Sequence, residues 1–320
     1  MPFTKRKEKQ EMNKIIAIVG PTAVGKTALA LRLARELDGE IISCDSMQIY
    51  KGMDIGTAKP TKEEQEEIKH HLIDIKSPDE EYSCADYAKD AREAIEDIVA
   101  RGKTPIFCGG TGLYLDSVIE IESFSSGVKD EAYRLELEKY AKENGNEALH
   151  KMLDEVDSIS ANEIHPNNVK RVIRALEIYK CTGIPKSEWD IKSKTATPPY
   201  DATVFFLTCE NRELLVNRIE KRVDIMLEEG LLKEANDLYK NGYLNEKYTS
   251  FSAIGYKELL PYIKGEDTLE NCVERLKIST RQYAKRQITW FSRKPSYNKV
   301  YIDKCDPYEV ALEILRGNNG

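Results

Sequence analysis

An eight-residue segment near the N-terminus, GPTAVGKT at residues 20–27, matches the phosphate-binding pattern G-x-x-x-x-G-K-[ST]. An apolar, β-branched run at residues 14–19 precedes it, and residues 27–37 follow with helical spacing. In this context the glycines let successive backbone N–H groups and the start of a helix face one anion. We therefore expect the whole loop to bind a di- or triphosphate: Gly20, Pro21, Thr22, Ala23, Val24, Gly25, Lys26 and Thr27. Lys26 would add a positive charge, and the Thr27 hydroxyl would ligate Mg²⁺.

The first 120 residues alternate between short apolar strands and amphipathic helices. Residues 40–44 and 104–108 are typical of strands, residues 83–101 form a helical pattern ending at Gly102, and residues 71–75 are a further candidate strand. Such alternation predicts an α/β protein with a P-loop NTPase-like parallel sheet flanked by helices.

The pattern changes near residue 120. Only helical periodicity follows up to residue 181, then a linker rich in Pro and Thr at residues 182–200, before residues 202–209 (ATVFFLTC) again resemble a buried strand. We therefore predict an all-helical insertion domain, residues 121–200, within a core domain formed by residues 14–120 and 201–320. The remainder is predicted to be helical at residues 211–228, 231–241 and 268–291, with a late strand at 299–302 and a helix from Pro307.

Composition narrows the class of protein. No apolar run approaches the 18 residues that a membrane-spanning helix needs, and the basic N-terminal arm, residues 1–13, lacks the pattern of a secretory signal. The seven cysteines are scattered and never spaced as Cys-x-x-Cys, which favours reduced thiols. The adjacent pair His70-His71 points to different faces and is a poor start for a metal site. We expect a cytoplasmic protein with a flexible N-terminal arm.

Charge is unevenly distributed along the chain. The net charge is −7, yet residues 275–299 contain eight basic and no acidic residues, interleaved with aromatic ones. This stretch has the composition of a nucleic-acid or polyphosphate contact. A solvated helix face is the other interpretation, and the residues alone leave both open.

Asp45 stands at the end of a predicted strand, in the segment IISCDS. The carboxyl end of a parallel strand beside a phosphate loop is a favourable place for a catalytic carboxylate. Alternatively, the Asp45 side chain would cap the N-terminus of a helix or lie in the second shell of ligands around Mg²⁺. The strand at residues 104–108 ends in Gly109-Gly110-Thr111-Gly112, without the acidic residue that a nucleotide hydrolase usually carries there.

Several longer motifs resemble those of the tRNA dimethylallyltransferases (tRNA isopentenyltransferases), and they run in family order from Gly20 to Phe291. Besides the phosphate loop they are DSMQIYKGMDIGTAKP at 45–60, HHLID at 70–74, EEYSCADY at 80–87, GGTGLY at 109–114, IHPNNVKRVIRALE at 164–177, RIEKRVDIMLEEGL at 218–231, AIGYKEL at 253–259 and TRQYAKRQITWF at 280–291. Val24, Asp157-Ser158 and Ser252 depart from residues frequent in the family. The C-terminal zinc finger of some eukaryotic relatives is absent, as in bacterial-type enzymes.

The resemblance implies an activity. It is the transfer of the dimethylallyl group from dimethylallyl diphosphate to N6 of the adenosine on the 3′ side of the anticodon, in tRNAs reading codons that begin with U. Diphosphate is released, Mg²⁺ is required, and the protein would act as a monomer in the cytoplasm.

The same resemblance implies roles for single residues. Asp45 would be the base, and Lys26, Thr27, Arg218 and Arg222 would act on the diphosphate. The predicted tRNA contacts are Asp45, Ser46, Met47, Gln48, Thr111, Arg134, Asn168, Lys170, Arg171, Arg281 and Lys285. For Arg218 and Arg222 the alternative is a pair of surface ion pairs with Glu228 or Asp224.

Three other functions share parts of this pattern. A phosphate-loop kinase would use Asp45 on a hydroxyl and would turn over ATP. An adenylate isopentenyltransferase would prenylate a free nucleotide, but so small an acceptor leaves the long basic helix unexplained. A non-catalytic nucleic-acid-binding switch would tolerate Asp45→Asn.

Overall fold

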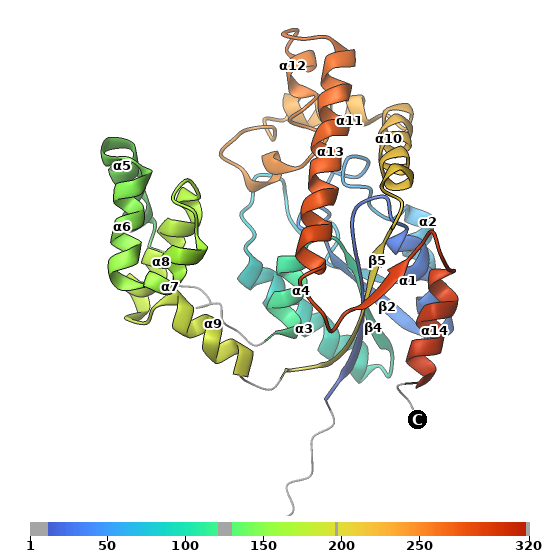
Figure 1. Cartoon of the computed structure of the whole chain (residues 1–320). Helices are drawn as coiled ribbons and strands as arrows, with labels where there is room; N and C mark the ends of the chain where they lie inside the picture. The colour runs from blue at the N-terminus through green and yellow to red at the C-terminus, as the bar shows by residue number, and fades with distance from the viewer. Residues whose placement is uncertain (1–11, 121–129, 196–197, 318–320) are drawn as a thin grey trace, which may run out of the picture. The chain divides into compact units, whose positions relative to one another are not determined.

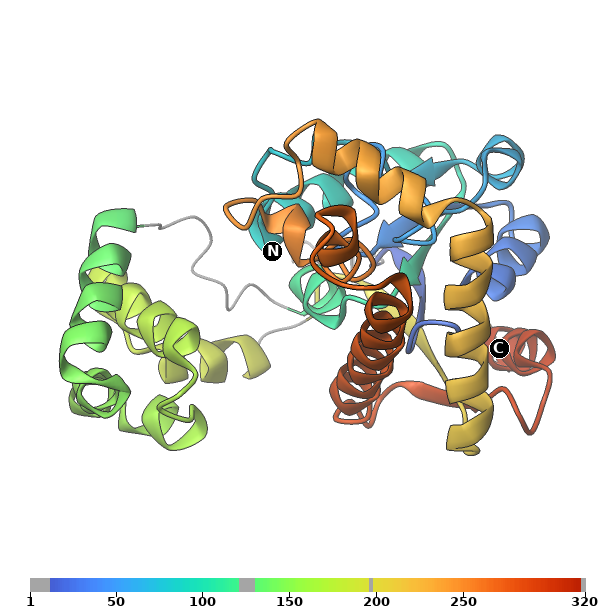
Figure 2. The same ribbon diagram turned by 90° about the horizontal axis from the view of Figure 1, so that it is seen from above.

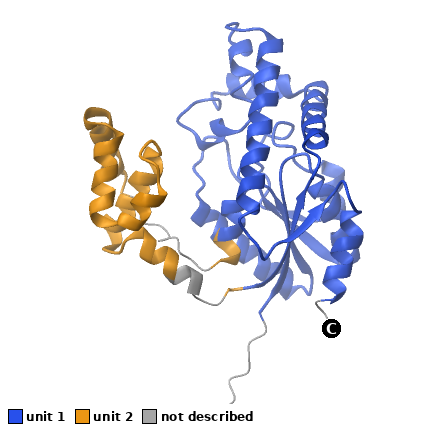
Figure 3. Ribbon diagram, viewed as in Figure 1, with its two compact units in different colours: residues 1–116, 200–320 blue, residues 117–199 orange. Residues whose placement is uncertain are grey.

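The computed structural model describes residues 12–120, 130–195 and 198–317. These residues form two compact units, one from residues 1–116 and 200–320 and one from residues 117–199 (Figure 3). Of the predicted N-terminal arm, residues 1–11 lie outside the described part, as do residues 121–129 and 196–197 of the predicted insertion.

The larger unit is built on a parallel sheet, which has six strands within the described residues (Figure 1). The strands are β1 (Lys14–Val19), β2 (Gly39–Cys44), β3 (His70–His71), β4 (Thr104–Gly109), β5 (Asp201–Thr208) and β6 (Asn298–Tyr301), in the order β3-β2-β4-β1-β5-β6. The predicted parallel sheet is confirmed. The strand expected at residues 71–75 is wrong beyond His71, because Leu72 and Asp74 have φ values of 61° and 56°, which extended pairing excludes.

Helices cover both faces of this sheet, as Figures 1 and 2 show. Before the insertion, the helices of this unit are α1 (Lys26–Glu36), α2 (Lys62–Glu67), α3 (Cys84–Ala100) and the first residues of α4 (Gly112–Ile119). After it come α10 (Arg212–Glu228), α11 (Leu231–Lys240), the 3₁₀ helix η1 (Thr249–Ser252), α12 (Leu260–Ile263), α13 (Leu269–Phe291) and α14 (Pro307–Gly317).

Successive side chains of each strand point to opposite faces of the sheet, and both faces are packed against helices. Ile16 and Ile18 of β1 pack with buried residues of α1 and α14 in one hydrophobic cluster. On the other face, Phe206 of β5 lies 5.6 Å from Phe291 of α13, measured between ring centroids. Because a strand exposes its residues to opposite faces in turn, strands buried on both sides appear as continuous apolar runs in the sequence.

Three loops leave the sheet at one edge. Val19 is in register with Gly109, and Gly109 is in register with Cys44, so β1, β2 and β4 end side by side. The segments that follow them are the phosphate loop, residues 45–48 and residues 110–112. The topology therefore gathers the main sequence motifs at the carboxyl edge of the sheet.

The smaller unit is all-helical within its described residues. Its helices are α5 (Glu131–Asn144), α6 (Asn146–Val156), α7 (Ser158–Glu163), α8 (Val169–Thr182) and α9 (Lys186–Thr195), and its core includes Leu137, Leu149, Leu153, Val172 and Leu176. The helical insertion is confirmed, but the linker predicted at residues 182–200 is partly wrong. Residues 186–195 form α9, whose Ser187 N–H donates to the buried carboxylate of Asp157 at 3.0 Å.

No helix in the described part of the chain combines the length and apolar character needed to cross a membrane.

Candidate active site

The phosphate loop has the backbone shape that an anion site requires. Gly20 has φ 146°, and a Cβ there would lie 2.2 Å from Leu207 O, so only glycine fits. Ala23 and Gly25 have φ values of 64° and 102°, and α1 starts without a side-chain cap. The N–H groups at the start of α1 are consequently left for a ligand.

A cavity of about 790 Å³ opens beside this loop, lined entirely by residues of the larger unit. Predicted site residues that line it are Thr22, Ala23, Gly25, Lys26, Thr27, Asp45, Ser46, Met47, Gln48, Arg218 and Arg222. Apolar side chains line it as well, including Ile219, Val223, Met226 and Leu276. The cavity thus combines a phosphate site with room for an apolar group.

Lys26 and Asp45 influence each other across the cavity. The Lys26 ammonium donates to Gly20 O at 3.1 Å and to Pro21 O at 2.8 Å. Burial lowers the pKa of Lys26 to about 8, and the Arg222 guanidinium acts in the same direction. Burial also raises the pKa of the Asp45 carboxyl, against the opposing charges of Lys26 and Arg222. A bound anion would favour the charged form of Lys26.

Asp45 is held by its own turn. Its Oδ1 accepts a hydrogen bond from the Met47 backbone N–H at 2.9 Å, and the residue is half-buried. A fixed, partly desolvated carboxylate with a raised pKa is the kind of group that acts as a base near neutral pH.

Arg218 and Arg222 of α10 face the phosphate loop. Arg218 Nε donates to Ala23 O at 2.8 Å, and Arg222 Nη1 lies 3.5 Å from Thr22 Oγ1. Among the described residues neither forms an ion pair, and Asp224 pairs instead with Lys277 at 2.7 Å. The arrangement favours a role at the anion site over the surface ion pairs that the sequence left as an alternative.

Thr22 contributes less to the anion site than the sequence indicated. Its backbone N–H donates to Gln287 Oε1 at 2.9 Å and is therefore occupied. The side chain of Val24, one of the three departures from the family pattern, is buried in the core cluster under α1.

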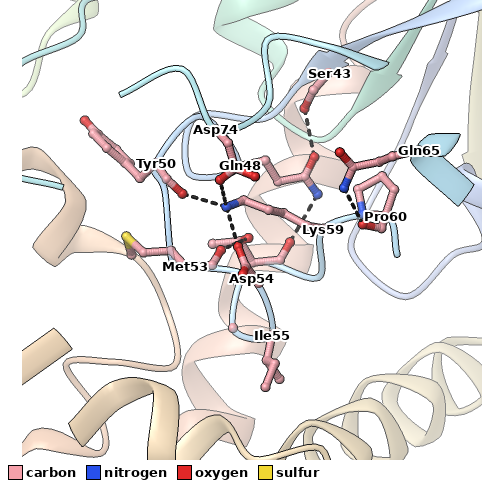
Figure 4. Close-up of polar contacts among 12 residues, drawn as sticks. Ser43, Gln48, Tyr50, Met53, Asp54, Ile55, Lys59, Pro60, Gln65 and Asp74 are labelled. Atoms are coloured by element: carbon pink, nitrogen blue, oxygen red, sulfur yellow. Dashed lines mark hydrogen bonds and ion pairs between the residues drawn. The ribbon is translucent and has the colours of Figure 1, made fainter. Parts of the chain in front are cut away.

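The segment after β2 is held by a buried lysine (Figure 4). Lys59 Nζ donates to Tyr50 O at 2.6 Å and to the carboxylates of Asp54 and Asp74, and its side chain is 3% exposed. Gln48 accepts from Ser43 Oγ at 2.8 Å and donates to the backbone of Thr57 and Ala58. Gln48 therefore stabilises its own loop, beside the cavity where a base contact was predicted.

A second anchor holds the same segment from α11. The Glu234 carboxylate accepts backbone N–H groups of Asp54, Ile55 and Gly56 and the hydroxyl of Tyr256. Ser252, another departure from the family pattern, lines the cavity and donates to Thr249 O at 2.7 Å.

The basic stretch at residues 275–299, which α13 carries up to Phe291, contains two kinds of residue. Arg275, Lys277, Arg281 and Lys294 form ion pairs with acidic residues, Arg281 with Glu220 and Glu274. Lys285 and Arg286 are exposed and have no ion pair in the described part of the chain, and Arg286 also lines the cavity. Half of the apparent basic surface is thus neutralised locally.

The remaining predicted tRNA contacts lie in the smaller unit. Asn168, Lys170 and Arg171 are exposed at the start of α8. Arg134 instead forms a bidentate ion pair with the buried Glu177 at 2.7 and 2.8 Å. Its predicted tRNA contact stays a prediction, while its structural role in this unit is plain.

Sequence reasoning missed four residues that shape the site: Lys59, Glu234, Tyr283 and Gln287. Lys59 had a signal, because it lies inside the long motif at residues 45–60. Tyr283 and Gln287 had one too, because they lie inside the motif at residues 280–291. Glu234 lies outside the quoted motifs, and only the packing of α11 reveals its partners.

Comparisons with known proteins agree with this geometry. The sequence model of the IPP transferase family matches residues 48–294. The tRNA dimethylallyltransferase of Geobacillus thermodenitrificans is 50% identical over 301 residues, 94% of each chain, and that of Acetivibrio thermocellus is 48% identical over 95% of this chain and 97% of its own.

Solved structures are similar over nearly the whole chain. The full-length tRNA isopentenylpyrophosphate transferase of Bacillus halodurans has a TM-score of 0.70 and 46% identity, covering 96% of both chains. A eukaryotic dimethylallyltransferase acting on tRNA has a TM-score of 0.81 and 34% identity, covering 96% of this chain and 79% of its own. With the phosphate loop, the strand-end aspartate and these likenesses together, the chain belongs to the IPP transferase family.

Proposed function

We propose that this chain is a tRNA dimethylallyltransferase, which moves the dimethylallyl group of dimethylallyl diphosphate to N6 of the adenosine 3′ to the anticodon, in tRNAs reading codons that begin with U. The observation that carries the proposal is the single cavity in which the phosphate loop, Asp45, Arg218 and Arg222 meet. Curated relatives that bear this name are about half identical to the chain over nearly its full length.

The phosphate loop would hold the leaving group. Negative charge grows on the diphosphate as the bond between its oxygen and the prenyl C1 breaks. The N–H groups at the start of α1, the Lys26 ammonium and the guanidinium groups of Arg218 and Arg222 would stabilise that charge. The apolar side chains of the same cavity suit the five-carbon group.

Mg²⁺ fits the donor set of this site. The Thr27 hydroxyl lines the cavity next to Lys26, and Mg²⁺ prefers oxygen ligands completed by phosphate oxygens and water. When bound, the ion would neutralise part of the diphosphate charge.

Asp45 would accept the proton from the acceptor. The exocyclic amine of adenine is a weak nucleophile, so removal of its proton helps as the bond from N6 to C1 forms, an effect commonly worth about 10²–10⁴ in rate. The adenine must leave the stacked anticodon loop to reach the cavity, which costs a few kcal/mol. Ser46 and Met47 line the cavity next to Asp45 and are the residues we expect to contact that base.

Exposed polar and cationic side chains would bind the RNA. Lys285 and Arg286 on α13, and Asn168, Lys170 and Arg171 at the start of α8, would contact phosphates. We expect a monomer in the cytoplasm, where tRNA is available.

The direct test is product analysis. Purified protein is incubated with Mg²⁺, unmodified tRNA and either dimethylallyl diphosphate or ATP, and the digested nucleosides are weighed. A prenyl increment on adenosine supports the proposal. ATP consumption with a small acceptor and no increment would move the protein to the kinase class.

Two variants assign the roles. Asp45→Asn should lose nearly all turnover and keep tRNA affinity. The control is Asp306→Asn, which should keep both, because Asp306 is an exposed aspartate that forms an ion pair with Arg32. Lys26→Ala should damage use of the prenyl donor more than tRNA affinity. Full turnover in Asp45→Asn would mean that another group accepts the proton, whereas loss of nearly all turnover with tRNA affinity kept would exclude the non-catalytic switch.

A further inference from the structure

Gln287 is a buried polar residue of α13 that the mechanism above does not use. Its side chain is 4% exposed. Its Oε1 accepts the Thr22 N–H at 2.9 Å, and its Nε2 donates to Gly110 O at 3.0 Å. Thr22 belongs to the phosphate loop and Gly110 to the turn after β4. One amide therefore joins two of the three loops at the edge of the sheet.

The Gln287 amide packs so closely against the turn that only glycine fits at position 110. A Cβ at Gly110 would lie 1.9 Å from Gln287 Nε2, so the turn and the amide fit only with glycine there. A glutamine amide offers an acceptor and a donor at its end, and both are used here. Since a buried N–H without a partner costs free energy, the loop conformation with Thr22 N–H turned toward α13 depends on this amide.

The neighbouring residues give the contact a functional setting. Lys285 and Arg286 are exposed, whereas Gln287 is buried, so consecutive residues of α13 reach the surface and the phosphate loop. One helical turn earlier, Tyr283 lines the cavity. The helix that carries the exposed cations Lys285 and Arg286 thus also supports the phosphate loop.

We propose that Gln287 is a positioning residue that holds the phosphate loop in its anion-binding shape and thereby sets the affinity for the diphosphate of the prenyl donor. The inference rests on the proposed function for the identity of that donor. It assigns Gln287 no contact with substrate. Its effect passes through the Thr22 backbone and the Gly110 turn.

Two substitutions at Gln287 separate its hydrogen bonds. Gln287→Met keeps the length of the side chain, and Met is a good helix former like Gln, but the substitution removes both hydrogen bonds. Gln287→Glu keeps the acceptor for Thr22 N–H, loses the donor to Gly110 O and adds a negative charge near the anion site. Gln282→Met is the matched control, because Gln282 is an exposed glutamine of the same helix.

Binding is measured without turnover. Isothermal titration measures the affinity for inorganic diphosphate in the presence of Mg²⁺. Fluorescence anisotropy measures the affinity for an anticodon stem-loop. Thermal unfolding tests whether each variant is folded. We expect Gln287→Met to bind diphosphate about tenfold more weakly, the loss expected for two neutral hydrogen bonds, with stem-loop affinity within twofold of the unchanged protein. Gln287→Glu should lose at least as much, and Gln282→Met nothing.

The opposite results are equally clear. Equal losses for diphosphate and stem-loop would make Gln287 a general support of the fold and overturn the inference, as would a diphosphate affinity in both Gln287 variants equal to that of the control. If Gln287→Met fails to fold, an unchanged diphosphate affinity in Gln287→Glu still overturns the inference. Selective loss of diphosphate binding in a protein that never prenylates tRNA would retain this inference and reject the proposed function.

Discussion

The Thr111 hydroxyl oxygen accepts the backbone N–H of Ser46 at 3.0 Å, and the Thr111 N–H donates to Cys44 O at 3.1 Å. The turn after β4 is thereby joined to the turn that carries Asp45. Together with Gln287, which joins the Gly110 turn to the phosphate loop, these contacts connect the three loops that follow β1, β2 and β4.

The Thr111–Ser46 bond predicts a defect in chemistry rather than in donor binding. Thr111→Val keeps the shape of the side chain and removes the acceptor, so the Asp45 turn loses its support. We expect the turnover number for prenyl transfer to fall about tenfold, because small displacements of a catalytic group are costly. Diphosphate affinity should stay within twofold, and Thr111→Ser should restore turnover. A variant that loses only diphosphate affinity would refute this assignment.

The shifted pKa values of Asp45 and Lys26 predict a bell-shaped pH profile of kcat/KM. Activity rises with pH as Asp45 loses its proton, at a pH above the usual carboxyl range because burial raises its pKa. Activity falls above about pH 8, where Lys26 of the free protein loses its proton and its attraction for the diphosphate. Lys26→Arg stays charged and should remove the alkaline fall. An alkaline limb unchanged in Lys26→Arg would assign it to another group.

The unpaired cation Lys285 predicts a change in the salt dependence of tRNA binding. Lys285→Glu should weaken binding and lower the slope of log K against log salt by roughly 0.9 for each lost phosphate contact, taking the value for duplex. Arg281→Glu should also weaken binding, but it breaks the Glu220 ion pair, so its thermal stability must be measured in parallel. Lys89→Glu on α3 is the control, with a side chain 75% exposed. Equal slopes for Lys285→Glu and Lys89→Glu would mean that the α13 cations are merely solvated.

The buried carboxylate of Glu40 in β2 predicts a pH-dependent stability that is separate from activity. Hydrogen bonds from Arg101, above all, lower the pKa of Glu40 to about 2, and His71 Nε2 lies 2.7 Å from the same carboxylate. The folded pKa is depressed, so this stabilisation is present above pH 4.5 and is lost as the pH falls toward 2. Glu40→Gln should lower the free energy of unfolding by about 2 kcal/mol at pH 7.

Chemical denaturation at pH 7 and pH 3 measures that difference. The exposed Glu93→Gln on α3 should change stability little at either pH, because its side chain is 66% exposed. A loss in Glu40→Gln that is the same at both pH values would contradict the linkage.

Local patterns were sufficient for most of the architecture. Strand and helix periods, the GPTAVGKT loop and the order of the motifs predicted the parallel sheet and the helical insertion, because each depends on neighbours in the sequence. The same reasoning failed where backbone conformation was unusual, as at Leu72 and Asp74, and where a helix is weakly amphipathic, as at residues 186–195.

What the sequence by itself determined was the chemistry available: a phosphate loop, a strand-end aspartate and two arginines one helical turn apart. Only the tertiary structure decided which of the predicted site residues already have hydrogen-bond or ion-pair partners within the protein. Arg281 and Arg134 are occupied by Glu220 and Glu177, Gln48 by its own loop, and Thr22 N–H by Gln287, which is far from it in the sequence. The physical reason is that hydrogen bonds and ion pairs between residues distant in the sequence depend on how sheet and helices pack, and a charged or polar residue carries no local sign of its partner.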